Sequence, residues 1–332
     1  MIQSAKKTLI DIPTASGHAS TIALCRDDIL LAWFGGTQEG APDVDIYTAR
    51  RHKGIWDAPH LIAGEADLPH WNPVFYARGD TIDLFYKVGT PIPRWHTRRM
   101  RSTDGGWAWT QPTELVQGDV GGRGPVRNKP LRLQSGRMLA PASVETAEQW
   151  NAFVDISDDD CETFRPSPFV PLWRKGEPLP RGCKKPPFET VGKGVIQPTL
   201  WQSVDGAVHM LLRSTEGYIL RSDSVDDGET WCFAYSTGIP NNNSGIDLAQ
   251  AEDGCIFLVS NPVSGNWAAR TPLLLSFSAD GGETFRPLLY LETNEGEYSY
   301  PAILSKGKTL FVSYTWKRQK IAFWEIETEA RL

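Results

Sequence analysis

The stretch that decides the fold is Ser278-Ala279-Asp280-Gly281-Gly282-Glu283-Thr284-Phe285, because its pattern occurs four times along the chain. The other copies begin at Ser102, Ser157 and Ser224, and the shared pattern is S-x-D-x-G-x-T-W/F. Ser and Asp can bond the backbone amides of a hairpin turn, Gly permits a positive φ, and the aromatic residue can enter the core. The first copy lacks the Thr and the second has Cys161 in place of the Gly, so we expect these two turns to be distorted.

The spacing of the four copies indicates a repeated sheet. Their aspartates, Asp104, Asp159, Asp226 and Asp280, are separated by 55, 67 and 54 residues, which fits a four-stranded unit with loops of variable length. The chain has room for one more unit before the first copy and one after the last. We therefore predict an all-β fold, a six-bladed β-propeller of four-stranded antiparallel blades, with residues 1–332 forming one domain. The segment from Lys7 to Ile12 should complete the last blade and close the ring.

Composition excludes several classes of function. The net charge is −6 and the chain has no extended Lys/Arg tract, so nucleic acid is not an expected partner. No segment is apolar enough to span a bilayer, and no signal-peptide pattern follows Met1, so we expect no membrane association and a cytoplasmic location. The sequence gives no indication of the oligomeric state.

The five cysteines do not indicate a disulfide framework or a metal site. They are odd in number and widely separated, without a CxxC motif, and the acidic residues lie in turns rather than in a spaced ligand set. We expect buried thiols, no metal and no cofactor.

A second repeated feature is a polar cluster before each apolar run that should form an innermost strand. The clusters contain His18, His70 to Asn72, Arg127 to Lys129, Gln197, Asn243-Ser244, and Glu297 to Tyr300. In a propeller the starts of the innermost strands surround the central axis on one face. We therefore expect the six clusters to converge on one funnel, where the functional site should lie.

The repeated turn is the Asp-box, also called the BNR repeat, and over nearly its whole length the chain resembles the sialidase (neuraminidase) superfamily. That resemblance implies a glycosidase in which three arginines hold the substrate carboxylate, a Tyr paired with a Glu is the nucleophile, and an Asp is the acid/base. Arg213 and Arg270 precede the third and fourth Asp-boxes, as the second and third arginines of the family do. Tyr298 matches the nucleophile, with Glu297 or Tyr300 assisting it.

The resemblance also places the acid/base in the loop from Gly35 to Asp45, where Glu39 and Asp43 are the preferred candidates. Two positions depart from the family pattern. His18 occupies the place of the first arginine, and Gln197 lies near the place of the Glu, although an amide cannot accept the tyrosine proton. The chain therefore looks more like the divergent bacterial "predicted neuraminidase" branch, with which it shares Trp33-Phe34-Gly35-Gly36-Thr37 and Tyr298-Ser299-Tyr300-Pro301. In that setting Gln197, Asn72, Lys129, Asn243 and Tyr300 are candidate substrate-binding residues.

Three functions are compatible with these residues. The first is a glycoside hydrolase that removes a terminal acidic sugar, a sialic acid or related ulosonic or uronic acid. The second is a polysaccharide lyase or atypical glycosidase that uses His and Tyr on a uronate, which His18 favours. The third is a glycan-binding or scaffolding propeller without catalysis, which would explain the missing Glu and the missing first arginine. For Arg213 and Arg270 themselves, the structural alternative is that each pairs with an acidic neighbour between blades. The expected partner is an acidic carbohydrate in all three.

Overall fold

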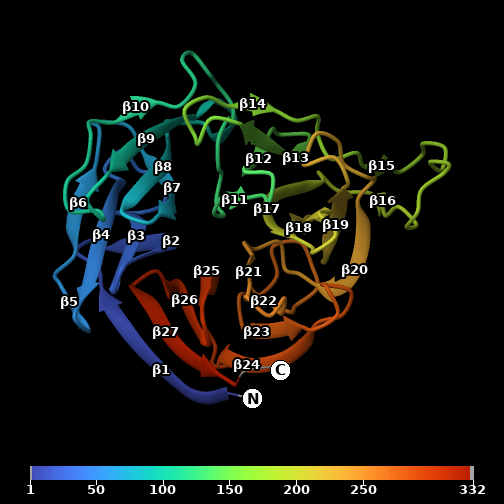
Figure 1. Cartoon of the computed structure of the whole chain (residues 1–332). Coiled ribbons are helices and arrows are strands. Elements are labelled where there is room, and N and C mark those ends of the chain that lie inside the picture. The colour runs from blue at the N-terminus through green and yellow to red at the C-terminus, as the bar shows by residue number, and fades with distance from the viewer. Residues whose placement is uncertain (1, 330–332) are drawn as a thin grey trace.

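The computed structural model describes residues 2–329, and its sheets form a ring of six blades around a central axis (Figure 1). This confirms the all-β, six-bladed propeller. In residues 2–329 the only helical element is a single 3₁₀ turn, η1 (Ile92–Arg94). No helix in the same residues is long and apolar enough to cross a membrane.

The first three blades follow one another along the chain. Blade 1 contains β2 (Ser16–Cys25), β3 (Asp28–Gly36), β4 (Asp45–His52) and β5 (Ile55–Trp56), with β6 (His60–Ala63) also pairing with β4. Blade 2 contains β7 (His70–Arg78), β8 (Thr81–Val88), β9 (His96–Ser102) and β10 (Thr113–Glu114). Blade 3 contains β11 (Leu131–Arg132), β12 (Met138–Glu145), β13 (Trp150–Ser157) and β14 (Arg165–Pro166).

The remaining blades follow after a short parallel pair, β15 (Trp173–Arg174) and β16 (Glu189–Thr190). Blade 4 contains β17 (Val195–Gln202), β18 (Val208–Ser214), β19 (Tyr218–Ser224) and β20 (Tyr235–Pro240). Blade 5 contains β21 (Asp247–Gln250), β22 (Ile256–Ser260), β23 (Leu273–Ser278) and β24 (Arg286–Glu292). Blade 6 contains β25 (Tyr298–Lys306), β26 (Thr309–Trp316) and β27 (Lys320–Thr328), and β1 (Ile2–Asp11) is its outermost strand.

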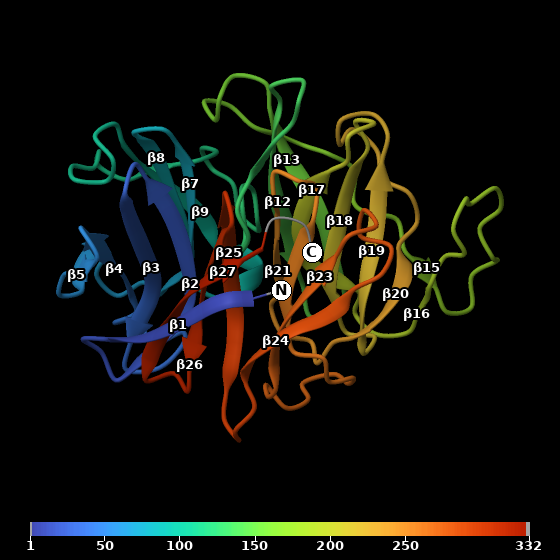
Figure 2. The same ribbon diagram turned by 60° about the horizontal axis from the view of Figure 1, so that its bottom comes forward.

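Closure of the ring joins the two ends of the chain. β1 pairs antiparallel with β27 along its length, from Ile2 opposite Thr328 to Asp11 opposite Lys320 (Figure 2). The strand expected from Lys7 to Ile12 is therefore present and begins five residues earlier. Pairing covers the edge of β27, which would otherwise expose a row of unpaired amides.

The repeated turns are held by their own side chains, as the pattern predicts. In the fourth copy the Asp280 carboxylate accepts hydrogen bonds from the Thr284 N–H at 2.9 Å, from the Thr284 hydroxyl and from the Ser278 hydroxyl at 2.7 Å. The hydrogen bonds from Thr284 lower the pKa of Asp280 to about 2. The carboxylate is thus part of the turn and not of a binding site.

The expected distortion of the second turn does not occur. Cys161 takes a φ of 71°, close to the 85° of Gly106, 83° of Gly228 and 87° of Gly282 at the same place in the other copies. Its amide still bonds the Ser157 hydroxyl at 2.9 Å. The turn keeps the shared conformation because its hydrogen bonds and the burial of the Cys161 side chain hold a non-glycine residue in the left-handed region.

The expectation of buried thiols is met only in part. Cys25, Cys161 and Cys255 are buried, whereas Cys183 is partly exposed and Cys232 is exposed. Cys183 lies in a loop outside the blades, and Cys232 follows the third Asp-box at the outer side of blade 4, so neither is in the core.

Four inner strands share a bulge that the sequence does not reveal. The ladders of β2, β7, β17 and β25 each skip two residues. The first skipped residue has a positive φ in every case: Ala19 at 57°, Asn72 at 41°, Gln197 at 52° and Tyr300 at 53°. A bulge turns its residue out of the regular alternation of a strand. Non-glycine residues in this conformation are uncommon, and their repetition at one end of the axis marks the place where side chains are redirected.

Replacing Asp280 with Ala should lower the free energy of unfolding by about 1 kcal/mol, because three exposed hydrogen bonds lose their acceptor. The folded-state pKa of Asp280 is depressed, so the carboxylate stabilises the fold above about pH 4, the ordinary Asp pKa, and this contribution is lost as the pH falls toward the folded-state pKa. As the pH falls across that range, urea unfolding should therefore show a decreasing difference in the free energy of unfolding between Asp280→Ala and the unaltered protein. Asp27→Ala, at an exposed turn position, is the control, and an equal loss in both variants would contradict the role given to the Asp-box.

Candidate functional site

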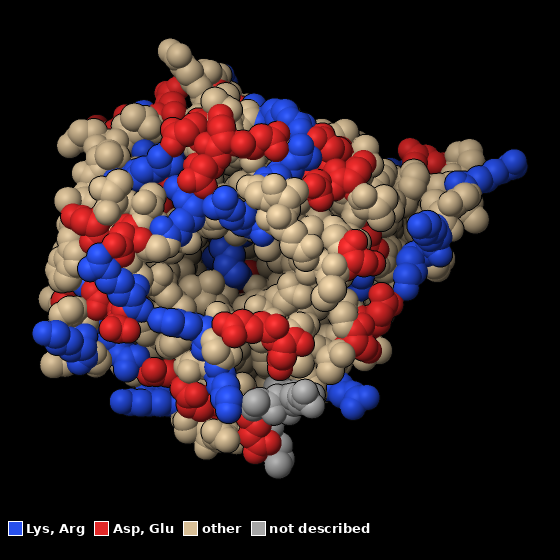
Figure 3. Space-filling model, in the orientation of Figure 1, with Lys and Arg blue, Asp and Glu red and all other residues tan. Residues whose placement is uncertain are grey.

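The candidate site lies on the axis, where the four bulged strands begin. Figure 3 shows a hollow at the centre of the ring with Lys or Arg side chains visible inside it. Four arginines surround His18 there, since the positive charges of Arg318, Arg270, Arg127 and Arg213 all act on its imidazole. In that order, the arginines come from blades 6, 5, 3 and 4. These four blades come together only around the axis.

Arg213, on β18, is held by neutral groups. It is 2% exposed, its Nε donates to the Asn243 side-chain oxygen at 2.8 Å, and Nη1 donates to the Gln197 side-chain oxygen at 3.0 Å and to the Tyr300 hydroxyl at 2.7 Å. None of these partners carries a formal charge at neutral pH. A buried guanidinium is costly unless its donors are bonded, and here the bonds are made without neutralising the charge.

Aromatic rings enclose the same guanidinium. Its carbon lies 5.5 Å from the ring centres of both Trp150 and Trp267 and 5.7 Å from that of Tyr300. The two indoles meet edge to face with their centres 6.4 Å apart, and Trp267 is 63% exposed. Low-dielectric surroundings strengthen the field of Arg213 toward a ligand, and the exposed indole offers an apolar surface at the rim.

Tyr300 is at the centre of the arginine group. The guanidinium carbons of Arg127 and Arg270 lie 5.4 and 5.6 Å from its ring centre, and the His18 ring centre is 4.2 Å away. Arg127 crosses the axis from the loop before blade 3 and donates to the Tyr300 and Pro301 carbonyl oxygens of blade 6. Arg213 and Arg270, which the sequence singled out, are thus brought together around one phenol.

The other two arginines have carboxylate partners. Glu297 accepts from Arg270 Nη1 at 2.6 Å and from Arg318 Nε at 2.7 Å, and Arg318 Nη1 also donates to Glu39 at 2.6 Å. Burial alone would raise the pKa of Glu297, but the two guanidinium groups outweigh it and hold that pKa below its usual range. Two of the four guanidinium groups, those of Arg270 and Arg318, are therefore paired with the two carboxylates, and the positive excess is on the side of Arg127 and Arg213.

His18 is neutral in this environment. Its Nδ1 lies 2.8 Å from the Thr315 hydroxyl, which also accepts the Ala19 N–H at 3.1 Å. Burial lowers the pKa of His18 well below the ordinary value, and the arginines lower it further. Its ring contacts the Tyr300 ring, and a neutral imidazole has one nitrogen that can accept a proton.

Tyr298 and Tyr300 take different directions although they are two residues apart. Tyr298 is 1% exposed and packs between blades 5 and 6, with its hydroxyl 3.5 Å from the Glu295 carbonyl oxygen. Tyr300 is the bulged residue and faces the arginines. The structure therefore does not bring Tyr298 into the funnel, because the bulge breaks the alternation that would keep both rings on one face.

Several other predicted residues position the site rather than line it. Lys129 is bound by both oxygens of Asp247, at 2.8 and 2.9 Å, and by the Leu248 carbonyl oxygen. Asn243 and Gln197 hold Arg213. The buried Asn72 differs, because no hydrogen bond to its side-chain amide is found within residues 2–329. The side-chain oxygen and nitrogen of Asn72 can therefore bind a ligand.

The three carboxylates of the loop from Gly35 to Asp45 differ in their hydrogen bonds and ion pairs. Asp43 caps its own loop by accepting the Thr37 N–H at 3.0 Å and the Thr37 hydroxyl at 2.9 Å. Glu39 is ion-paired with Arg318. Asp45, at the start of β4 and 3.7 Å from His70 Nδ1, has its pKa raised by burial. Burial of Asp45 therefore favours its protonated form.

Three residues of the site were not predicted. Arg127 could have been found, because it opens one of the six polar clusters. Arg318, in the hairpin between β26 and β27, and Glu145, at the end of β12, carry no sequence signal. One carboxylate oxygen of Glu145 is buried without a hydrogen-bond partner, and burial raises the pKa of this group against the opposing charges of Arg213 and Lys87.

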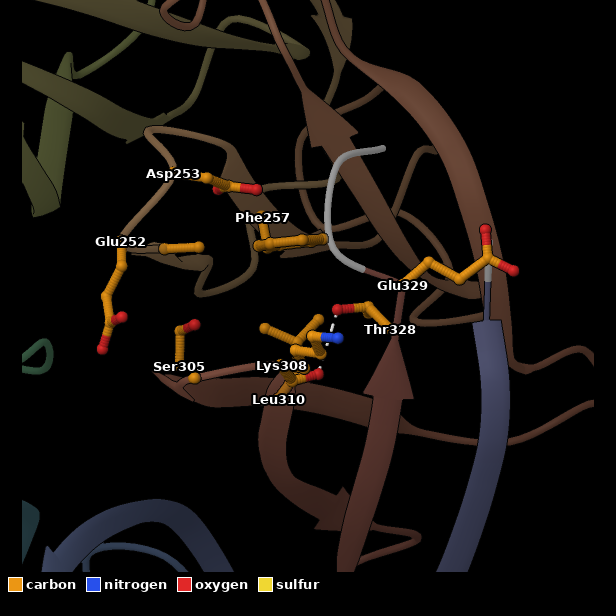
Figure 4. Close-up of a pocket in the computed structure, with 10 residues that line it drawn as sticks. Glu252, Asp253, Phe257, Ser305, Lys308, Leu310, Thr328 and Glu329 are labelled. Atoms are coloured by element: carbon orange, nitrogen blue, oxygen red, sulfur yellow. Dashed lines mark hydrogen bonds between the residues drawn. The ribbon is translucent and has the colours of Figure 1, made fainter.

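A separate pocket of about 310 Å³ lies at the opposite ends of the inner strands, beside the β21–β22 and β25–β26 hairpins (Figure 4). Glu252, Asp253, Lys308 and Glu329 line it. It has neither a convergent set of cations nor a phenol. Within residues 2–329 no group of His, Cys, Asp and Glu is arranged to hold a metal ion.

Comparison with known proteins agrees with the fold. The family model for the BNR repeat-like domain matches residues 27–312. No curated protein sequence matches the chain. A protein of unknown function from Dyadobacter fermentans is similar in structure, with a TM-score of 0.75, 16% identity, and coverage of 99% of this chain and 100% of that one.

Trypanosoma rangeli sialidase and NanB are also similar in structure. Trypanosoma rangeli sialidase in complex with the inhibitor DANA has a TM-score of 0.73 at 10% identity, with 98% of this chain covering 60% of that chain. NanB with Optactamide has a TM-score of 0.70 at 13% identity, with coverage of 97% and 70%. The chain therefore spans less than two thirds of the T. rangeli enzyme, and identities this low establish a shared fold only.

The state of His18 can be tested by its titration. NMR of the imidazole nitrogens should find it neutral at pH values where an ordinary histidine, with a pKa of about 6.5, is half protonated. The folded-state pKa is lower than the unfolded one, so only the unfolded state gains a proton below about pH 6.5, and stability must fall as the pH decreases through that value. His18→Gln should lose this part of the pH dependence, and His60→Gln, at an exposed position, should keep it. An ordinary pKa for His18 would contradict the buried position among four arginines that the structure gives it.

Proposed function

The chain belongs to the BNR repeat-like domain family, and from this premise we propose that it is a glycoside hydrolase that removes a terminal acidic sugar from a glycan. The sugar is a sialic acid or a related ulosonic or uronic acid. Solved structures of T. rangeli sialidase similar to this chain are described as complexes with sialic acid and, with a difluorosialic acid, as a covalent intermediate. Those ligands belong to that enzyme and serve here as the first probes.

One observation carries the proposal: Arg213 is buried beside the axis with neutral partners only. A structural arginine normally meets a carboxylate between blades, as Arg270 and Arg318 meet Glu297. Arg213 and Arg127 leave a positive excess beside the axis. A sugar carboxylate is the ligand that supplies the missing charge and accepts bonds from a planar guanidinium.

Tyr300 is the nucleophile in this proposal. A neutral phenol can approach the anomeric carbon beside the substrate carboxylate, where an anionic side chain would be repelled. As the Tyr300 oxygen forms its bond to that carbon and the bond to the glycosidic oxygen breaks, the phenolic proton passes to His18, and Arg213 stabilises the charge that develops on the Tyr300 oxygen. Water then attacks the same carbon, the Tyr300 oxygen leaves and regains its proton from His18, and the free sugar is released. His18 thereby takes the part for which Gln197 is unsuited.

Departure of the glycosidic oxygen requires a proton donor. The donor must be a carboxyl group that keeps its proton near neutral pH. Burial raises the pKa of Asp45 and of Glu145. Both are better suited to this role than Glu39, which is held by Arg318, or Asp43, which caps its own loop.

A second candidate is a lyase acting on a uronate. The contact between neutral His18 and Tyr300 favours it, because arginines that bind a uronate carboxylate also stabilise the enolate formed when the neighbouring proton is removed. His18 would remove that proton and Tyr300 would donate one to the leaving oxygen. The product would be an unsaturated uronate, formed without water.

Replacing Arg213 with Ala should weaken binding of DANA at least about 30-fold, roughly 2 kcal/mol, because the carboxylate loses a buried charge-assisted partner. Isothermal titration at neutral pH measures the effect. The matched control is Arg26→Ala, which removes an arginine whose side chain is 74% exposed and paired with Asp80. Equal affinities of the two variants would show that the axis does not bind the carboxylate.

Replacing Tyr300 with Phe should abolish turnover and change DANA affinity by less than about threefold, since the phenol acts on the reacting carbon. Tyr298→Phe is the matched control and should retain activity, because that ring packs between blades. Fluorogenic glycosides of sialic and glucuronic acids report hydrolysis, and near-ultraviolet absorbance of a uronate polymer reports elimination. Full activity of Tyr300→Phe in both assays would refute the assignment of Tyr300. If the unaltered protein gave near-ultraviolet absorbance without hydrolysis, the lyase would be selected.

A further inference from the structure

The segment between blades 3 and 4 leaves the propeller and projects from its side (Figures 1 and 2). It comprises residues 171–194, which we call the arm. Its base is the parallel pair β15–β16, in which Trp173 lies opposite Glu189 and Arg174 opposite Thr190. The arm is not needed to complete a blade, because blades 3 and 4 each have four strands without it.

The arm is basic although the protein is acidic. It holds six Lys or Arg residues and two Glu residues, in a chain with a net charge of −6. Its cations are Arg174, Lys175, Arg181, Lys184, Lys185 and Lys193. Figure 3 shows Lys and Arg side chains along the projection.

Most of these cations lack an acidic partner. Lys185 is paired with Glu283, 3.0 Å away, and the Arg174 side chain donates to backbone carbonyl groups. For the remaining four, Lys175, Arg181, Lys184 and Lys193, the structure of residues 2–329 contains no ion pair. All four are exposed. Their charge therefore faces solvent without compensation.

The base of the arm is continuous with the candidate site. The Lys193 ammonium group lies 5.9 Å from the Trp150 ring centre, and the Arg213 guanidinium carbon lies 5.5 Å from the same ring centre. Arg174 Nη1 bonds the Lys193 carbonyl oxygen at 3.0 Å, and the Trp150 N–H bonds the same oxygen at 3.0 Å. Positive charge thus runs from the axis past one indole to the arm.

We propose that the arm binds the rest of a polyanionic glycan, a polymer of carboxylated sugars, whose terminal residue enters the axial site. This inference rests on the proposed function and narrows its substrate class from any glycan with an acidic end to one that carries charge along its length. A single exposed charge pair contributes little. Several cations in a row attract a polymer that presents several carboxylates at once, and salt weakens this attraction.

The test compares two triple variants of equal charge change. Lys175→Glu, Arg181→Glu and Lys184→Glu alter the arm. Lys6→Glu, Lys53→Glu and Lys308→Glu alter exposed positions elsewhere on the propeller and form the control. The probes are DANA and α-2,8-linked oligosialic acids and oligogalacturonates of three and eight residues. Dissociation constants are measured at low and at physiological salt, in the Tyr300→Phe background, so that no probe is consumed.

We expect the control to bind one of the two octamers at least about tenfold more tightly than its trimer at low salt, and less so at physiological salt. The arm variant should lose most of that gain while its affinity for DANA equals that of the control. Equal octamer binding by the two variants overturns the inference, and so does the absence of any length dependence. If DANA binds neither variant but the octamer still requires the arm, the arm binds the polymer as inferred, and the proposed function, with its axial site for the terminal sugar, is wrong.

Discussion

The candidate site depends on one buried positive charge, which hydrogen bonds to uncharged groups hold in place without neutralising it. Arg213 is fixed by an asparagine, a glutamine and a phenol, and is enclosed by two indoles, so its donors are satisfied while its charge is retained. Such an arrangement costs folding free energy that a carboxylate partner would reduce. The rest of the ring compensates through its core and its closed strand edges, and the uncompensated charge is available to an anionic ligand. Burial lowers the pKa of His18 and the four arginines lower it further, so the imidazole remains neutral in the same surroundings.

The bulges of the inner strands explain how a repetitive fold produces an irregular site. A regular strand would send alternate side chains to the same face, and residues two apart would share a neighbourhood. At β2, β7, β17 and β25 the ladder is interrupted at the end nearest the funnel, and Gln197 and Tyr300 are at two of these interruptions. Glycine would take this conformation more easily. The presence of side chains at these positions indicates that the strain is retained for what those side chains contact.

The sequence predicted the ring well and the site only in part. Four Asp-boxes gave the number and positions of the blades, because each residue of that pattern has a local task that does not depend on distant neighbours. Arg213 and Arg270 were found because each precedes an Asp-box, as the second and third arginines of the family that the chain resembles do. The choice of Tyr298 over Tyr300 depended on the bulge, which is a property of the ladder and not of local composition. Arg127 and Glu145 come from blade 3 and Arg318 from blade 6, and only the closed ring shows that both arginines act on His18 and that Glu145 is near Arg213.

The claim that an acidic sugar occupies the axis is tested most directly by a crystal structure of the protein soaked with DANA. The account predicts the ligand carboxylate within about 3 Å of the Arg213 guanidinium, the spacing of a charge-assisted hydrogen bond. It also predicts that a second of the four arginines around His18 contacts the same carboxylate and that the Tyr300 hydroxyl faces the sugar ring. A ligand bound outside the hollow, or an axis in which Arg213 keeps only its protein partners at saturating ligand, would contradict it.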